Sequence, residues 1–369
     1  MTKSEMDPLF DSNCAERLLS WFDNNKRSMP WRDSNDPYAI WISEIMLQQT
    51  RVDQALPFFN RFMTAFPSVH DLAAASTQHV LKQWEGLGYY SRARNIHKTA
   101  KIVADDYADS LPREYEELLA LPGIGPYTAA AIASIAFGLE HAVMDGNVIR
   151  TVTRFCGIEQ DTRKTGTRKL VQQEVDDWIK GHPPADFNQA LMELGATVCT
   201  PTKPSCETCP LASKCIAYRT AKTEHIPYTS KKAKRPHQEI SVAIIINEQE
   251  EVLIAQRPEH VMLGGLWEFP GGKQESNETS VEALHREIQE ELGIEISVIE
   301  EFMSLKHAYS HFTITLSAFL CVLKPTNTQQ TPTAKASEQI KWVSIQDLKN
   351  YPFPKANKTL TLALMKRFA

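Results

Sequence analysis

The spacing of hydrophobic and polar residues predicts helices through the first 220 residues or so of the chain. The stretch DPYAIWISEIMLQQTRV has the start of a helix, with Asp36 as a plausible N-cap and Pro37 at the first helical position. β-Branched alternating runs are scarce in this part. Further helix-length segments lie around residues 53–65, 76–85, 91–107, 114–121, 126–137, 147–156, 168–180 and 186–195.

The pattern changes after this helical part. The stretch IPYTSKKAKRPHQ (226–238) is basic and contains prolines, which is typical of a linker. Beyond it, alternating and β-branched runs predict strands, and one long amphipathic run predicts a helix. The sequence therefore predicts a multidomain protein, with an all-α part over residues 1–225 and a separate α/β domain over residues 239–369.

Composition narrows the class of protein. The net charge of −5 gives no global sign of nucleic-acid binding, so any basic surface must be local. The N-terminus carries charges and no apolar signal-peptide core, and the longest helical apolar run, AAAIASIAFG (129–138), is too short to cross a bilayer. We therefore expect a cytoplasmic protein without a membrane partner.

The cysteines are unevenly distributed. Three of the seven are scattered, and the other four follow a C-x6-C-x2-C-x5-C pattern at Cys199, Cys206, Cys209 and Cys215. Cysteines of a cytoplasmic protein are expected to be reduced or metal-bound, so four thiolates at this spacing predict a metal site. Zinc and a 4Fe–4S cluster are both compatible with four cysteines.

Three further motifs in the helical part carry candidate chemistry. In LPGIGPYTAAAIA, Gly123 and Gly125 allow a tight turn that exposes amide groups to a phosphate, although a plain helical hairpin would use the same glycines. Asp145 in HAVMDGNVIR is typical of a helix cap. Glu44 in WISEIMLQQT has apolar neighbours, which would raise its pKa; the alternative is a glutamate on a solvent-facing helix surface.

Together these motifs resemble the helix-hairpin-helix DNA glycosylases with an iron–sulfur cluster, and in detail the adenine DNA glycosylases of the MutY family. The resemblance rests on SEIMLQQT, WEGLGYYSRARN, LPGIGPYTA, DGNV and the cysteine spacing. It implies a six-helix barrel over about 35–140 and an iron–sulfur module built from the N-terminal helix and about 141–225. It also implies that the four cysteines bind a 4Fe–4S cluster.

The same resemblance assigns roles to residues of the helical part. Glu44 would be the general acid/base and Asp145 the carboxylate that faces the sugar, with Asn147 and Tyr127 orienting them. A base must leave the helical stack before it can be excised, and Gln49 and Tyr89 match the family's inserting positions. The hairpin glycines Gly123 and Gly125 would contact the DNA backbone.

Position 127 separates this chain from a similar family. Endonuclease III carries a lysine there, which forms a Schiff base that leads to strand cleavage. The tyrosine of this chain cannot form an imine. We therefore expect base excision without efficient lyase activity.

The C-terminal domain contains a complete Nudix box from Gly272 to Ile294, and LWEFPGGK and FPKAN resemble the 8-oxo-dGTP hydrolase MutT. In the adenine glycosylases such a domain recognises 8-oxoguanine in DNA. By that resemblance the lesion-reading residues are Tyr309, where the family has phenylalanine, Ser310 and His311, with Asn357 as a further candidate.

The intact Nudix box leaves two readings open. In one, Glu287, Glu290 and Glu291 bind Mg²⁺ and the domain hydrolyses nucleoside triphosphates. In the other, the acidic helix is an inherited structural element, supported partly by an Arg286–Glu290 pair one helical turn apart.

The function that we expect is excision of adenine mispaired with 8-oxoguanine or guanine. The expected partner is duplex DNA, bound by a cytoplasmic, nucleoid-associated monomer. Two rivals belong to other classes: a Nudix pyrophosphatase with a helical accessory region, and a non-enzymatic DNA-binding module with structural zinc. The activity of a Nudix pyrophosphatase would survive Glu44→Gln and would be lost without Glu290 and Glu291. A DNA-binding module with structural zinc would bind duplex DNA, release no adenine and be colourless.

Overall fold

The computed structural model describes residues 9–231, 235–325 and 330–368 of the chain. The chain divides into two compact units. The first comprises residues 1–52, 68–70 and 98–232, and the second comprises residues 53–67, 71–97 and 233–369. Helices α3 (Val52–Ala65), α4 (Val69–Ala74) and α6 (Ser91–Asp106) contribute residues to both.

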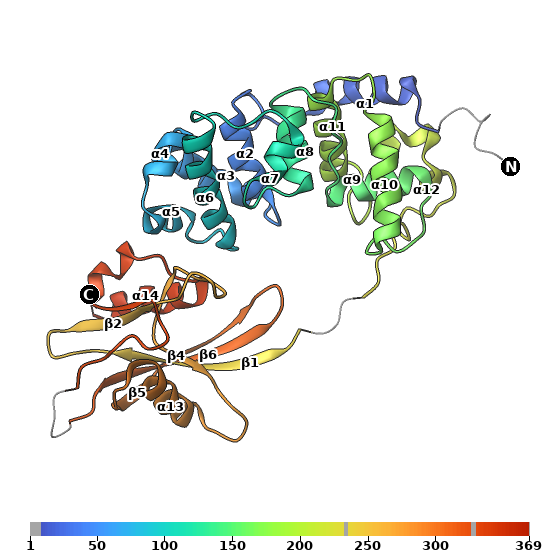
Figure 1. Cartoon of the computed structure of the whole chain (residues 1–369). Helices are drawn as coiled ribbons and strands as arrows, with labels where there is room; N and C mark the ends of the chain where they lie inside the picture. Colours follow the sequence, from blue (N-terminus) through green and yellow to red (C-terminus); the bar gives the residue numbers. More distant parts are fainter. Residues whose placement is uncertain (1–8, 232–234, 326–329, 369) are drawn as a thin grey trace. The chain divides into compact units, whose positions relative to one another are not determined.

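The first unit is helical (Figure 1). Asp36 accepts a hydrogen bond from Tyr38 N and Pro37 opens the second helix, which confirms the start that the sequence predicts. The helices are α1 (Ser12–Asn25), α2 (Pro37–Leu47), α7 (Tyr115–Ala120), α8 (Pro126–Ile135), α9 (Gly146–Cys156), α10 (Thr165–Trp178), α11 (Pro184–Thr197) and α12 (Ile216–Arg219), with the 3₁₀ helices η1 (Cys206–Thr208) and η2 (Ala212–Lys214).

A hydrophobic core joins α1, α8, α9, α10 and α11. On α9, Val148, Val152 and Phe155 recur every three or four positions, so they form one apolar face that is buried in this core. Phe10 stacks on Trp178 with 4.2 Å between ring centroids. Burial of this face fixes the N-terminus of α9, where Asp145 caps the helix.

The second unit combines helices with two β-sheets. Its helices are α3 (Val52–Ala65), α5 (Thr77–Trp84), the first part of α6, α13 (Ser280–Leu292) and α14 (Lys355–Arg367), with the 3₁₀ helix η3 (Ile345–Asn350). The strands are β1 (His237–Ile245), β2 (Glu251–Gln256), β3 (Trp267–Glu268), β4 (Gly271–Lys273), β5 (Ile296–Ala308), β6 (Thr313–Leu323) and β7 (Gln339–Ser344).

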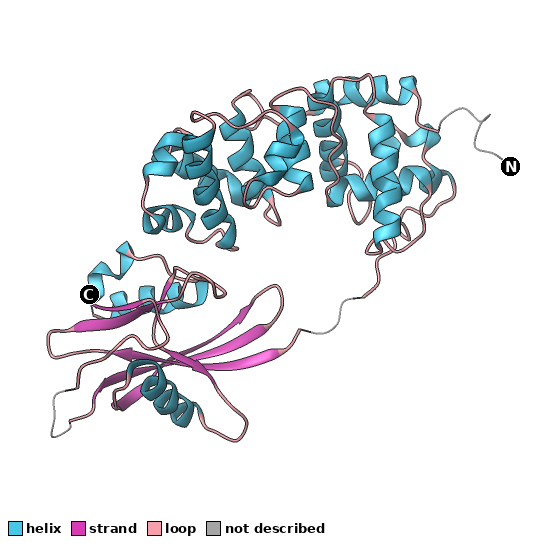
Figure 2. Cartoon of the chain, viewed as in Figure 1, coloured by secondary structure: helices cyan, strands magenta, loops and turns pink. Residues whose placement is uncertain are grey.

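One sheet has the strand order β4-β1-β6-β5 and the other β3-β2-β7. The central pair β1 and β6 is parallel, with Ile240 opposite Leu316, and the other pairs are antiparallel. Figure 2 shows the strands with helices on both sides. This arrangement confirms the α/β fold class that the sequence predicts for the C-terminal part.

The two faces of β1 are both buried, against different helices. Successive side chains of a strand point to opposite faces. Val242 and Ile244 belong to a core that includes Leu360 of α14, whereas Ala243 and Ile245 belong to a core that includes Leu284 of α13. Such burial explains why ISVAIIIN is apolar at nearly every position rather than at alternate ones.

The helix that contains the Nudix box has both of its ends defined by local sequence. Thr279 and Glu282 form a capping box at its start, and Gly293 ends it with φ 68°. In the part of the chain that the structure describes, no helix combines the length and apolar character needed to span a bilayer.

Candidate functional site

Glu44 lies in the most enclosed helix of the first unit. Every residue of α2 from Tyr38 to Met46 is buried, and Glu44 itself is 6% exposed. Burial disfavours the charged carboxylate and raises the pKa of Glu44 to about 7. The amphipathic alternative, with Glu44 on a solvent-facing surface, is therefore wrong.

Three neighbours adjust the pKa of Glu44. The Tyr127 hydroxyl, from α8, donates to Glu44 Oε2 over 2.8 Å and favours the ionised form. The negative charge of Asp145 raises the pKa, and the positive charge of Arg32 lowers it. Tyr127 also contacts Met192 Sδ at 3.4 Å. The result is a carboxyl group that can hold or release a proton near neutral pH.

Asp145 is both a helix cap and a member of this site. Its Oδ1 accepts a hydrogen bond from Val148 N at 2.7 Å, and its Oδ2 accepts one from Asn147 Nδ2 at 2.8 Å. Burial raises the pKa of Asp145, while these hydrogen bonds and the charge of Arg150 act against the rise. The N-cap that the motif suggests is thus confirmed, and it holds the carboxylate close enough to Glu44 to influence its pKa.

Arg150 is a site residue that the sequence reasoning missed. Its guanidinium donates to Asn147 Oδ1 at 2.8 Å, to the carbonyl of Gly195 at 2.6 Å and to the carbonyl of Cys199 at 2.6 Å. Asn147 in turn donates to Asp145. One chain of hydrogen bonds therefore connects Asp145 with the backbone of the first cysteine. The signal in the sequence was the i, i+3 spacing of Asn147 and Arg150 on one helix.

Gly195 makes this chain of contacts possible. A Cβ atom placed there would lie 2.5 Å from the Cβ of Asn147 and 3.0 Å from its carbonyl oxygen. Because real atoms do not approach that closely, any larger residue would push α11 away from α9.

The four cysteines face a single small cavity. Cys199, Cys206, Cys209 and Cys215 all line it, together with Arg154 of α9. Arg154 Nη1 donates to Cys199 Sγ at 3.4 Å. Among the residues that the structure describes, no group of three or more His, Cys, Asp or Glu side chains is close enough to hold a metal ion.

The glycine hairpin adopts the backbone that its sequence predicts. Gly123 has φ 78°, a left-handed conformation that glycine adopts without strain, and Gly125 is the N-cap of α8 without a side-chain cap. The first amide groups of α8 are consequently not occupied by a capping side chain. Such a terminus can bind an anion.

The two residues expected to insert into DNA share an uncommon backbone conformation. Gln49 has φ 58° and Tyr89 has φ 49°, both in the left-handed region that residues other than glycine rarely adopt. Gln49 lies between α2 and α3, and Tyr89 lies between α5 and α6. Strained positions of this kind are often functional, which supports the assignment of both residues.

Tyr89 contacts the loop that is expected to recognise the lesion. Its hydroxyl lies 2.6 Å from Ser310 Oγ in the turn between β5 and β6. Tyr309 packs against Phe312 and His307, whereas His311 is exposed. Asn357, on α14, is buried and accepts a hydrogen bond from Phe269 N at 3.2 Å. Its amide oxygen therefore already serves the fold.

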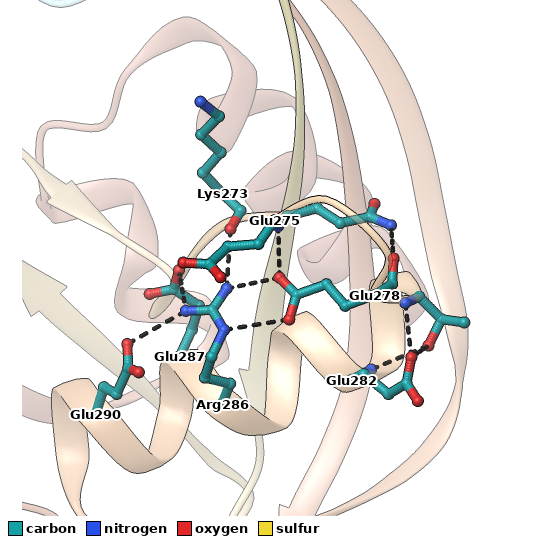
Figure 3. A network of polar contacts seen from close by, with 9 residues as sticks. Lys273, Glu275, Glu278, Glu282, Arg286, Glu287 and Glu290 are labelled. Atoms are coloured by element: carbon teal, nitrogen blue, oxygen red, sulfur yellow. Dashed lines mark hydrogen bonds and ion pairs between the residues drawn. The ribbon is translucent and has the colours of Figure 1, made fainter.

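The acidic residues of the Nudix box surround an arginine (Figure 3). Arg286 Nη2 lies 2.7 Å from Glu278, and Nη1 lies 3.0 Å from Glu287 and 3.2 Å from Glu290. The pair with Glu290 that the sequence predicts is confirmed. Glu291 instead accepts a hydrogen bond from Gly271 N, and burial raises its pKa to about 7. The three predicted ligands of Mg²⁺ thus have different partners.

The folds and these sites define a helix-hairpin-helix DNA repair protein joined to a Nudix domain. Residues 42–177 match the family described as "HhH-GPD superfamily base excision DNA repair protein", and residues 241–363 match "NUDIX domain". Among solved structures, a thermostable thymine-DNA glycosylase is similar, with 29% identity, a TM-score of 0.51, and coverage of 56% of this chain and 95% of that one.

Relatives similar over most of the chain share one name, "Adenine DNA glycosylase". The mouse protein is 35% identical over 90% of this chain and 74% of its own length, and the human protein is 34% identical over 89% and 70%. The protein of Buchnera aphidicola subsp. Acyrthosiphon pisum is 34% identical over 83% and 85%. The chain belongs to the adenine DNA glycosylase family, whose members are base excision DNA repair enzymes.

Proposed function

We propose that this protein excises adenine that is mispaired with 8-oxoguanine or guanine in duplex DNA. The observation that carries the proposal is the proximity of two carboxyl groups, the buried Glu44 and the partly buried Asp145, whose environments differ. Glu44 is surrounded by apolar residues, and its pKa is raised to about 7. Asp145 accepts two hydrogen bonds at the N-terminus of α9, which favour its charge.

The two groups suit the two requirements of the reaction. Adenine leaves readily only when its N7 is protonated, and Glu44 holds a proton that it can give up near neutral pH. Departure of the base leaves positive charge on the sugar, which the carboxylate of Asp145 can stabilise. Glu44, once ionised, can then accept a proton from the attacking water.

Access to this pocket requires that the adenine rotate out of the helix, at a cost of a few kcal/mol. In our proposal Gln49 and Tyr89 occupy the space that the base leaves, with the hairpin at Gly123 and Gly125 bound to the phosphate backbone. Both residues lie in connections between helices and have a left-handed backbone. Tyr89 is 40% exposed, which suits a residue that meets DNA.

The reaction ends at base removal. Tyr127 donates a hydrogen bond to Glu44 and has no amine that could attack the sugar.

We propose that Tyr309, Ser310 and His311 recognise the base opposite adenine. Guanine has an acceptor at N7, but 8-oxoguanine has a donor there, and the oxygen of Ser310 can accept that proton. Asn357 is a further candidate.

We propose that the four cysteines bind a 4Fe–4S cluster. Their thiols line one cavity, and their spacing matches that of the iron–sulfur module of the adenine DNA glycosylases. When bound, the cluster supplies a rigid support for the chain around it. A brown protein with visible absorbance and about four irons per chain would support the cluster, and a colourless zinc protein would contradict it.

The acidic helix of the Nudix box is proposed as a structural element. Arg286 already pairs with Glu278, Glu287 and Glu290, whereas Glu291 accepts a hydrogen bond from Gly271 N. The Mg²⁺ site at Glu287, Glu290 and Glu291 stays a prediction. A Mg²⁺ titration with 8-oxo-dGTP tests it, because turnover that disappears in a Glu290→Gln, Glu291→Gln variant would establish a second activity.

The remaining expectations also stay predictions: a helical barrel over about 35–140, an iron–sulfur module over about 141–225, a monomeric state and a cytoplasmic, nucleoid-associated location.

The test of the proposed function is single-turnover excision from duplexes with adenine opposite 8-oxoguanine, guanine or thymine. We expect excision opposite the first two bases only, and near-complete loss of excision in Glu44→Gln and Asp145→Asn. Full excision in either variant would contradict the proposal.

A further inference from the structure

Within the second unit, the loop between α5 and α6 is bound to the segment that precedes α14. The loop comprises residues 85–90 and contains Gly86 and Gly88, whose φ values of 100° and 77° permit its tight course. The segment contains Phe353, which is 1% exposed and stacks on Phe269 of the domain core. The loop is therefore attached to a rigid part of the unit.

Two side chains of the loop bind the backbone of Phe353. Glu85 Oε1 accepts a hydrogen bond from Phe353 N at 3.0 Å, and the Tyr90 hydroxyl donates to Phe353 O at 3.3 Å. The same hydroxyl accepts a hydrogen bond from Gly86 N at 3.1 Å. Both backbone polar groups of Phe353 are thus satisfied by this loop. We call these contacts of Glu85 and Tyr90 with Phe353 the joint.

The joint is reinforced by buried charge. Glu85 is 6% exposed and its Oε2 pairs with Lys358 Nζ at 2.6 Å and with Lys82 Nζ at 2.9 Å. Burial alone would raise the pKa of Glu85, but hydrogen bonds from Lys358, Phe353 N and Lys82 bring it below its ordinary value. A buried carboxylate with three donors is strongly directional, so it fixes the loop in one position.

Tyr89 lies inside this loop, next to the anchored Tyr90. Its hydroxyl is 2.6 Å from Ser310 Oγ, and the guanidinium of Arg92 lies 5.3 Å from its ring centroid. Arg92 also donates to Gly88 O at 3.2 Å. The position of the Tyr89 ring relative to Ser310 is consequently determined by a loop whose two ends are bound to Phe353.

We propose that Glu85 and Tyr90 are positioning residues that hold Tyr89 against Ser310 before DNA binds. This inference rests on the proposed function, in which Tyr89 enters the helix and Ser310 recognises the opposite base. If Tyr89 and Ser310 are already in place, DNA binding does not have to order the loop. The affinity for the correct base is then not reduced by the entropy cost of that ordering. The joint therefore contributes to discrimination between opposite bases rather than to bond cleavage.

The existence of the joint is tested by amide hydrogen exchange on the full-length protein without DNA. We expect slow exchange at Phe353 N and Gly86 N in the wild type. In Tyr90→Phe, which removes only a hydroxyl, exchange at Gly86 N should accelerate. The control is Tyr228→Phe, an exposed tyrosine of the first unit. Fast exchange at both amides in the wild type would refute the joint, whether or not the protein excises adenine.

The role of the joint is tested by single-turnover excision of adenine opposite 8-oxoguanine and opposite guanine. In Tyr90→Phe and Lys358→Met we expect the preference for 8-oxoguanine over guanine to fall about tenfold, because misplacement of a contacting group by a fraction of an ångström has effects of this order. The rate of excision opposite 8-oxoguanine at saturating enzyme should stay nearly unchanged. The matched control is Lys324→Met, which removes an exposed pair with Glu295 in the same unit.

The double variant Glu85→Gln, Lys358→Met separates positioning from simple loss of stability. Its glutamine can still accept the hydrogen bond from Phe353 N without a buried unpaired charge, so it should regain most of the preference that Lys358→Met loses. If Tyr90→Phe and Lys358→Met keep the preference of the wild type, and the wild type excises adenine, the inference about the joint is overturned but the proposed function is not. No excision by the wild type on any duplex would instead overturn the proposed function.

Discussion

Tyr127 donates its hydroxyl hydrogen to Glu44 Oε2 across 2.8 Å, although the buried setting of Glu44 favours the protonated carboxyl. The two influences on the pKa of Glu44 are opposite in sign. Burial raises the pKa, and this hydrogen bond limits the rise because it stabilises the ionised form. The value of about 7 therefore depends on a residue of another helix.

Removal of the Tyr127 hydroxyl should move the pH dependence of excision. In Tyr127→Phe the ionised form of Glu44 loses a donor, so the pKa of Glu44 rises and the acid stays protonated to higher pH. We expect the alkaline limb of the single-turnover pH profile to shift upwards, so that the variant keeps more of its maximal rate at pH 8. Tyr115→Phe, in the same core but without a contact to Glu44, is the control. A limb that moves down would contradict the assignment of Glu44 as the acid.

Glu44→Gln should stabilise the protein while it abolishes excision. The pKa of Glu44 is about 7 in the folded chain and 4.5 in the unfolded one, so the folded state loses stability as pH rises through this interval. Above pH 7 the loss is about 3 kcal/mol, and a neutral glutamine avoids it. Denaturation by urea should show the variant more stable than wild type at pH 8 and nearly equal at pH 4.5. Equal stability at both pH values would disprove the raised pKa.

Ser310→Ala should reduce discrimination between opposite bases more than it reduces excision. The serine oxygen lies 2.6 Å from the Tyr89 hydroxyl and is our candidate acceptor for N7–H of 8-oxoguanine. Loss of one such hydrogen bond is expected to lower the preference for 8-oxoguanine over guanine about tenfold. Binding and single-turnover excision on duplexes with adenine opposite 8-oxoguanine and opposite guanine measure this preference. The variant His311→Ala is compared in parallel.

Ser304→Ala is the control for this prediction, because Ser304 is an exposed serine on β5, the strand that leads into the turn containing Ser310. An equal loss of preference in both variants would remove Ser310 from the recognition site.

The elements of the fold were largely accessible from sequence because their signals are local. Asp36 and Pro37 specify the start of α2, and Thr279 with Glu282 specifies the start of α13. The site residues Glu44 and Asp145 were found by motif. Their proximity was implied only by resemblance, since residues far apart along the chain meet through packing of α2, α8 and α9 that no local pattern encodes.

The supporting contacts could not be predicted in this way. Arg150 donates to carbonyl groups of Gly195 and Cys199, and backbone acceptors leave no trace in side-chain identity. Glu85 likewise binds the amide of Phe353 and Lys358, more than 250 residues away in sequence. Arg286 was expected to pair with Glu290 from helical spacing, whereas its bond with Glu278 depends on a loop conformation.

Hydrogen bonds through Asn147 and Arg150 connect Asp145 with the backbone of Cys199. Arg150→Lys keeps the charge but cannot donate simultaneously to Asn147, Gly195 and Cys199, because a lysine lacks the planar fork of the guanidinium. Asn147 should then hold Asp145 less firmly, and single-turnover excision should fall about tenfold to a hundredfold, the effect of one lost charge-assisted hydrogen bond. Visible absorbance and iron content per chain report whether the cysteine site is still loaded.

Gly195→Ala provides an independent route to the same defect. Its added Cβ would lie 2.5 Å from the Cβ of Asn147, so α9 and α11 must separate and the bond from Arg150 to the carbonyl at position 195 must lengthen. Overpacking of this kind costs about 1–3 kcal/mol of stability. In Arg150→Lys, and likewise in Gly195→Ala, the rate of excision should fall by the same factor on the duplex with 8-oxoguanine as on the duplex with guanine. The reason is that Asp145 acts on the sugar whichever base lies opposite adenine. A selective loss on one duplex would show that this chain of contacts serves recognition rather than the carboxylate.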